Sequence, residues 1–174
     1  MRALALLTAA VLAGCTALPP PPPAGGWSGK LGYRIEAGGE RRPQAGSALF
    51  ELQGDAARGQ LLLTSPLGTA LAQAQWDAQG LRLHDGREWT AFESLDALGQ
   101  ALGETLQGPP LPLQALFDWL AGRPWPGAPS EALPGGAFLQ LGWRVERVDE
   151  RLLNLERPAQ GGLGATRLRL VLNP

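Results

Sequence analysis

The chain has 174 residues, which is enough for one domain with a sizeable core and too few for two. Its 15 basic and 16 acidic residues give a net charge of −1, and no block of basic residues predicts binding to nucleic acid. The single cysteine excludes an intramolecular disulfide, and the chain has no G-x-S-x-G motif, phosphate-binding glycine loop or metal-ligand cluster. The composition therefore does not favour an enzyme.

Residues 1–14 have the pattern of a secretory signal peptide. Arg2 stands next to the start, the apolar run after it is too short to span a bilayer, and small residues precede Cys15. Residues 12–15 (LAGC) resemble the lipobox of bacterial lipoproteins, in which the cysteine receives acyl chains and becomes the mature N-terminus. Thr16 stands where an acidic residue would resemble an inner-membrane retention signal, so we expect an anchor in the outer membrane, facing the periplasm. The alternative is a chance cysteine at the end of an ordinary signal peptide.

The lipidated Cys15 and a proline-rich tether occupy residues 15–26. Five consecutive prolines favour the polyproline II conformation, at about 3.1 Å per residue, so the segment is a semi-rigid spacer between anchor and domain. A proline-rich recognition motif is the alternative, and the position directly after the anchor favours the spacer.

Period-two alternation dominates from Trp27 onward and predicts half-buried antiparallel strands. The apolar positions of the first strands are Leu31, Tyr33 and Ile35, then Ala48, Phe50 and Leu52, then Ala70, Ala72, Ala74 and Trp76, and then Leu81 and Leu83. Those of the last strands are Leu139, Leu141, Trp143 and Val145, then Leu153 and Leu155, and then Leu168, Leu170 and Leu172. The pattern predicts about nine strands in all.

The middle of the chain has a helical period instead. It predicts helices near residues 94–107 and 112–122, the first capped by Ser94 and ended by the run from Gly108 to Pro110. The apolar stripes of the two helices are Leu95, Leu98, Leu102 and Leu106, and Leu113, Leu116, Phe117 and Leu120. Because the helices fall between two groups of strands, we expect them to cover one mouth or face of the sheet as a lid.

A long run of antiparallel strands in one domain favours a barrel or a sandwich, because a twisted open sheet of this size leaves costly edges. Small side chains at Ala70, Ala72 and Ala74 leave room on the inner face of one predicted strand. Trp119 lies beside the stripe of the second helix and is a candidate to line a space between lid and sheet. We therefore predict an apolar cavity that takes a flexible hydrophobic ligand.

The candidate residues of this cavity come from both groups of strands and from the second helix. They are Leu31, Tyr33, Phe50, Leu52, Ala70, Ala72, Ala74, Trp76, Leu116, Trp119, Leu120 and Trp143. For Trp76 and Trp143, packing in a filled core explains the pattern equally well.

Residues 64–69 (TSPLGT) predict a tight turn with an apolar tip. Pro66 and Gly68 fit the second and fourth positions of a type I turn, which places Leu67 at the third. An exposed leucine forgoes about 1.5–3 kcal/mol of burial free energy, so we expect Leu67 to meet an apolar partner. A chance leucine on a turn, or one packed under a neighbouring loop, is the alternative.

Three segments carry a recognisable pattern. Residues 61–69 read LLLTSPLGT, residues 106–113 and 118–122 read LQGPPLPL and DWLAG, and residues 27–31 read WSGKL. The first looks like the strand–loop–strand segment of the LolB family of bacterial outer-membrane lipoprotein receptors. The second resembles that family's helix with the pattern P-x-P-L and W-[LI]-x-G, and the third fits its opening strand.

The resemblance implies a mainly β fold: a single-domain, unclosed antiparallel β-barrel over residues 27–174, with a helical lid over an apolar cavity for acyl chains. It implies a monomer without cofactor, metal or nucleic acid, which accepts triacylated lipoproteins from a LolA-like periplasmic carrier and inserts them into outer-membrane lipid. It also places the turn of Pro66, Leu67 and Gly68 at the bilayer. The main alternative is a lipid-anchored structural or assembly module that acts through protein contacts. A periplasmic hydrolase is disfavoured, because no nucleophile–base set is present.

Overall fold

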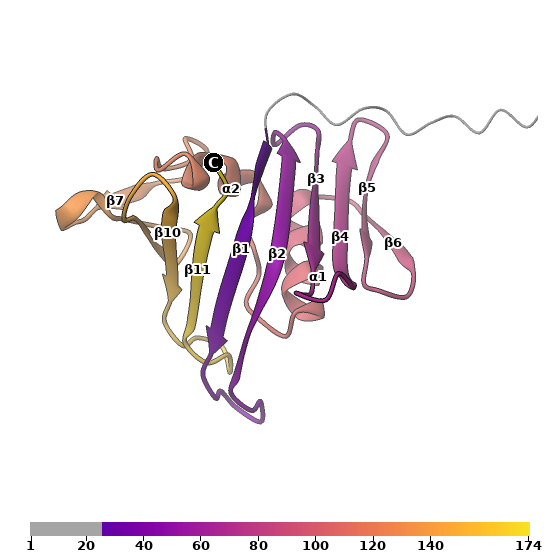
Figure 1. Ribbon diagram of the computed structural model, residues 1–174, viewed down its shortest axis with the longest axis horizontal. Coiled ribbons are helices and arrows are strands. Elements are labelled where there is room, and N and C mark those ends of the chain that lie inside the picture. The colour runs from indigo at the N-terminus through magenta and orange to yellow at the C-terminus, as the bar shows by residue number, and fades with distance from the viewer. Residues whose placement is uncertain (1–25) are drawn as a thin grey trace, which may run out of the picture.

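The computed structural model describes residues 26–174, which form one curved antiparallel sheet and two helices (Figure 1). The predicted signal peptide, Cys15 and all of the tether except Gly26 lie outside the described residues. The strands are β1 (Gly26–Ile35), β2 (Gln44–Gly54), β3 (Gly59–Thr64), β4 (Ala70–Asp77), β5 (Gly80–His84), β6 (Trp89–Phe92), β7 (Ser130–Ala132), β8 (Phe138–Gln140), β9 (Trp143–Arg147), β10 (Leu152–Arg157) and β11 (Thr166–Leu172). The helices are α1 (Leu95–Thr105) and α2 (Leu113–Leu120), and a short 3-10 turn covers Pro134–Gly136.

The eleven strands follow the order β6-β5-β4-β3-β2-β1-β11-β10-β9-β8-β7. The first and last strands pair in the middle of the sheet, where Gly29 lies opposite Leu172 and Ile35 opposite Thr166. Within residues 26–174 the sheet ends at β6 on one side and at β7 on the other, so it is not closed. The expected unclosed antiparallel fold is confirmed, and the sequence pattern missed the shortest strands.

Both helices lie on the concave side of the sheet, behind the strands in Figure 1. Helix α1 packs against β4, β5, β6 and α2. Ser94 is the N-cap of α1, as the sequence predicts: its Oγ accepts a hydrogen bond from the Ala97 N–H at 3.1 Å. No helix of residues 26–174 has both the length and the apolar content that crossing a membrane requires.

The buried face of α2 differs from the predicted stripe. The helix buries Leu113, Ala115, Trp119 and Leu120. Leu116 and Phe117, expected at the centre of the stripe, are only half-buried. Turning the helix toward Trp119 buries a larger apolar side chain and gives its N–H a partner, because Trp119 Nε1 donates to Gln140 Oε1 at 2.8 Å. Packing against the sheet therefore decides which side of this short helix faces inward.

The C-terminal alternation through Leu139, Leu141, Trp143 and Val145 does not form one strand, and that prediction is wrong. The chain reverses between β8 and β9, where Gln140 pairs with Trp143 across a two-residue turn. Leu141 and Gly142 have φ values of 52° and 78°, and two positive φ angles are the mark of a type I′ hairpin turn. Leu139 and Leu141 are consequently exposed, whereas Trp143 and Val145 are buried.

Replacing Leu141 with asparagine should stabilise the protein. A leucine in the left-handed region costs about 1–3 kcal/mol, and asparagine is among the residues that this turn position prefers. We expect Leu141→Asn to raise the free energy of unfolding by about 1 kcal/mol, measured by urea denaturation. Leu139→Asn, at an exposed strand position beside the turn, is the control and should not stabilise; an equal gain in both variants would contradict the backbone explanation.

Candidate functional site

A pocket of about 270 Å³ lies between the concave side of the sheet and the chain that leaves α1. Its wall is mainly apolar, with polar groups where strands end. The lining residues are Leu31, Tyr33, Ile35, Gln44, Ala48, Leu63, Leu71, Asp85, Gly103, Thr105, Leu106, Gln107, Gly108, Pro109, Leu111, Trp143, Thr166 and Leu168. The first and last strands thus meet at the pocket, although they are far apart in the sequence.

The structure brings three of the twelve predicted cavity residues to this pocket: Leu31, Tyr33 and Trp143. Another group packs in the continuous core beside it, namely Phe50, Leu52, Ala72, Ala74, Trp76, Trp119 and Leu120. Leu116 is half-buried against the same core, and Ala70 is exposed. Sequence reasoning missed the segment from Gly103 to Leu111, because no period relates a loop to the sheet that it covers.

Leu71 lines the pocket because the pairing of β3 with β4 is irregular. Leu63 pairs with Ala72 but Thr64 pairs with Ala70, so Leu71 is the extra residue of a register shift. A bulge of this kind breaks the alternation and redirects a side chain. Ala70, expected on the inner face, is therefore exposed, and Leu71, expected on the outer face, reaches the pocket.

The segment 106–111 closes the pocket by lying along α1. Gly99 and Gly103 are one turn apart on the buried side of α1, and a Cβ at either position would collide with the carbonyl oxygens of Leu111 or Pro109. Beyond that packing, Gln107 accepts a hydrogen bond from Gln44 Nε2 at 2.8 Å, which joins the segment to β2. Because this pair is exposed, water can replace it at low cost.

The loop between β3 and β4 has the predicted turn and an unpacked tip. The Gly68 N–H donates to the Ser65 carbonyl at 2.9 Å, the Thr69 N–H donates to Ser65 Oγ at 3.1 Å, and Gly68 has a φ of 87°. Leu67 is 94% exposed, more than any other large apolar side chain of residues 26–174. Since β1 and β3 both run antiparallel to β2, this tip lies toward the end of the sheet opposite Gly26 (Figure 1).

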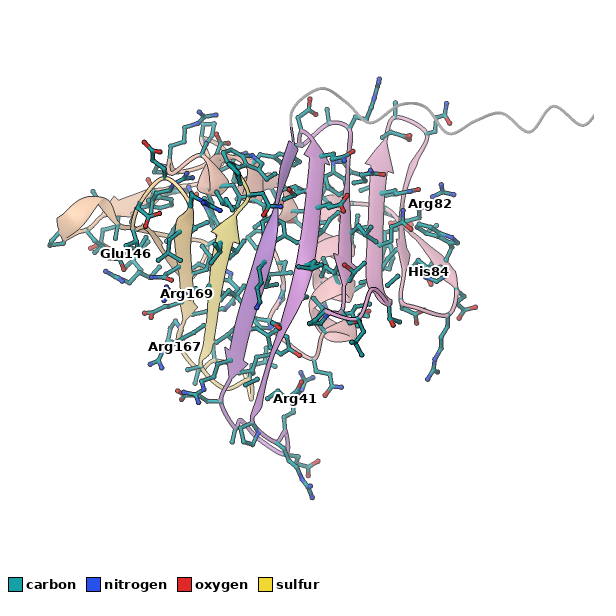
Figure 2. All side chains as sticks on the ribbon, viewed as in Figure 1. Arg41, Arg82, His84, Glu146, Arg167 and Arg169 are labelled. Carbon is teal, nitrogen blue, oxygen red and sulfur yellow. The ribbon has the colours of Figure 1, made fainter. Side chains whose placement is uncertain are left out.

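The polar side chains near the pocket do not form an acid–base pair. Hydrogen bonds from the backbone N–H groups of Glu88 and Arg87 hold the pKa of the Asp85 carboxyl below its ordinary value, so the carboxylate is bound to its own turn. His84 Nδ1 accepts from the Gly86 N–H, and its ring packs on Trp89. Figure 2 shows His84 and Arg82 along β5, on the face of the sheet turned away from the helices. In residues 26–174 no three possible ligands are grouped to hold a metal ion.

Known proteins match this chain over nearly all of the described residues. The family model described as "Outer membrane lipoprotein LolB" matches residues 26–173. The outer-membrane lipoprotein LolB of Chromobacterium violaceum is 30% identical over 168 residues, which cover 90% of this chain and 87% of the relative. LolB of Bordetella petrii is 32% identical over 169 residues, covering 87% and 82%, and LolB of Ralstonia nicotianae is 32% identical over 169 residues, covering 84% and 78%. The chain therefore belongs to the LolB family of outer-membrane lipoproteins, which are lipoprotein receptors and not enzymes.

Proposed function

We propose that this receptor takes the acyl chains of triacylated lipoproteins from a LolA-like carrier into the pocket under segment 106–111 and releases them into outer-membrane lipid. The mainly apolar pocket between sheet and segment is the observation that carries the proposal. Acyl chains gain about 0.8 kcal/mol per buried methylene, so they need an apolar site at every step across water. A modest difference in affinity for acyl chains between carrier, receptor and membrane sets the direction of transfer, without a cofactor.

The pocket must enlarge to hold its cargo. Its volume of about 270 Å³ is just below the range of about 300–1,000 Å³ that is usual for small-molecule sites, and three acyl chains need more. Segment 106–111 is the part of the wall that can lift, because the exposed Gln44–Gln107 pair is its side-chain link to β2. We propose that cargo entry separates this pair and moves the segment. When the cargo leaves, the segment packs against α1 again, because Gly99 and Gly103 have no side chains that would block it.

We propose that Cys15 carries the acyl anchor of the receptor itself and that residues 16–26 act as its spacer. Mass spectrometry of the mature N-terminus checks the acylation: an unmodified Cys15, or cleavage elsewhere, would exclude the anchor. The single domain of residues 27–174 then works as a monomer on the periplasmic face of the outer membrane.

Binding of acyl chains is tested with the mature chain that lacks Cys15, residues 16–174. We expect this chain to bind a fluorescent fatty-acyl probe in one assay and a lipoprotein presented by a LolA-like carrier in a second assay. Absence of binding in both would exclude the receptor mechanism proposed for the pocket and favour a module that acts through protein contacts alone.

Leu168→Gln should weaken binding of the acyl probe by roughly fivefold or more, because an amide in an apolar wall lacks hydrogen-bond partners. Leu168 lines the pocket, and Val171 on the same strand lies on the exposed outer face. Val171→Gln is therefore the matched control and should bind the probe as the unaltered chain does. Fluorescence titration measures both, with thermal unfolding to check folding; equal affinities in the two variants would place the acyl site elsewhere.

A further inference from the structure

One buried donor at the pocket has no acceptor. Trp143 is fully buried and lines the pocket, yet its indole N–H has no hydrogen-bond partner within residues 26–174. The other two buried indoles of residues 26–174 are paired: Trp119 Nε1 donates to Gln140 Oε1 and Trp76 Nε1 donates to the Asp55 carbonyl, each at 2.8 Å. Buried polar groups in proteins are nearly always paired, so the Trp143 N–H is available to an acceptor that enters the pocket.

A guanidinium group lies over the ring that carries this donor. Arg157 has the same orientation along β10 as the buried residues Leu153 and Leu155, so its side chain starts from the concave face. Its Cζ atom is 5.8 Å from the centre of the Trp143 ring. The group is half-buried, and within the described part of the chain it forms no ion pair with a carboxylate. Its hydrogen bond to Gln160 Oε1 is long, at 3.4 Å, which leaves most of its five N–H donors free.

Strand register places both donors next to the pocket wall. Arg144 pairs with Glu156 and Arg157 pairs with Thr166, so Trp143, Arg157 and Thr166 follow one another across β9, β10 and β11. Thr166 pairs in turn with Ile35, which lines the pocket, as Thr166 itself does. The donors therefore lie at the end of the concave face where the strands give way to loops, while the aliphatic wall lies deeper.

We propose that the Trp143 N–H and the Arg157 guanidinium form a subsite for acyl carbonyl oxygens at the rim of the pocket. This inference rests on the proposed acyl-chain function and names the part of the ligand that the alkyl wall cannot recognise. An acyl chain reaches a lipoprotein through an ester or amide, whose carbonyl oxygen accepts hydrogen bonds and carries no full charge. With the chains in the deeper wall, that oxygen meets the two donors at the rim, which sets how far the chains enter.

A comparison of ester with ether lipids tests the subsite directly, because the ether has the same chains and headgroup but no carbonyl oxygen. The probes are a short-chain diester phosphocholine and its diether analogue, each competing with a fluorescent acyl probe for residues 16–174. We expect the unaltered chain to bind the diester about tenfold more tightly, the usual scale for one buried donor gaining its acceptor. The free fatty acid of the same length is the third probe and identifies a site for carboxylate instead.

Two variants assign the preference to residues. Arg157→Met keeps most of the stem and removes the guanidinium, and Trp143→Phe removes the N–H. Both should bring the affinity ratio of diester to diether close to one. Arg169→Met is the control, since Arg169 is exposed on the outer face of β11 (Figure 2), and it should keep the ratio. Thermal unfolding checks each variant, and Arg157→Met alone suffices if Trp143→Phe does not fold.

The outcomes separate the inference from the proposed function. Equal binding of diester and diether by the unaltered chain would overturn the subsite and leave the acyl pocket standing. A preference that survives in both variants, or a stronger affinity for the free acid that Arg157→Met abolishes, would also overturn it. Absence of binding for every probe would overturn the proposed function itself.

Discussion

Trp119→Ala is expected to lower the free energy of unfolding by about 3–5 kcal/mol, the usual cost of truncating a buried tryptophan. Trp119 is 1% exposed, it belongs to the core and not to the pocket wall, and its N–H donates to Gln140 Oε1 at 2.8 Å. The variant leaves a cavity between α2 and β8, where Gln140 also accepts from the backbone N–H of Trp125 and donates to the backbone carbonyls of Trp125 and Ala128. Urea denaturation measures the loss.

Trp119→Phe separates the hydrogen bond from the packing. It keeps most of the apolar area and should cost clearly less than Trp119→Ala, in the range of about 1–3 kcal/mol. A Trp119→Ala protein with unchanged stability and weaker acyl binding would contradict the core assignment and return Trp119 to the cavity wall.

Leu67→Glu is expected to slow delivery of lipoproteins to membranes by roughly tenfold or more while leaving cargo acceptance intact. Leu67 is 94% exposed and contributes nothing to the core, so folding and the pocket should not change. A charged side chain costs about 2.5–3.5 kcal/mol at the centre of a bilayer, and part of that penalty applies wherever the tip enters lipid. Transfer from a LolA-like carrier to the receptor, and from the receptor to liposomes, are measured as separate steps.

Val148→Glu is the matched control for the tip. Val148 is also an exposed aliphatic residue in a loop, 52% exposed, but it lies after β9, at the end of the sheet that Leu67 does not occupy. Its substitution should leave both steps unchanged. If acceptance and delivery fall together in Leu67→Glu, or if neither changes, the tip has no separate role at the membrane.

The alternating strands of this fold could be predicted because one face is buried. Phe50, Leu52, Trp76, Leu153 and Leu155 are all core residues at the positions that the alternation gives. The short edge strands β6 and β7 could not be predicted, since most of their residues are exposed and carry no alternation. The tip at Leu67 was predictable because Pro66 and Gly68 determine that turn locally.

Most of the pocket could not be predicted, because it depends on backbone irregularity and on a loop. The register shift beside Leu71 and the turn at Leu141 both interrupt an alternation that continues in the sequence. Gln140 is the informative case: it is 2% exposed, although glutamine is normally a surface residue. It stands two residues after Phe138 and therefore on the same buried face of β8, and this spacing is the sequence signal for a polar core position.

The unclosed sheet allows the interior to change volume without breaking strand pairs. In a closed barrel the number of strands and their stagger fix the circumference and hence the interior. Here the strands end at β6 and β7, so curvature can relax while every backbone ladder from β6 to β7 stays paired. The concave side of this sheet can therefore widen by bending alone, which a closed barrel of fixed strand number and stagger does not allow.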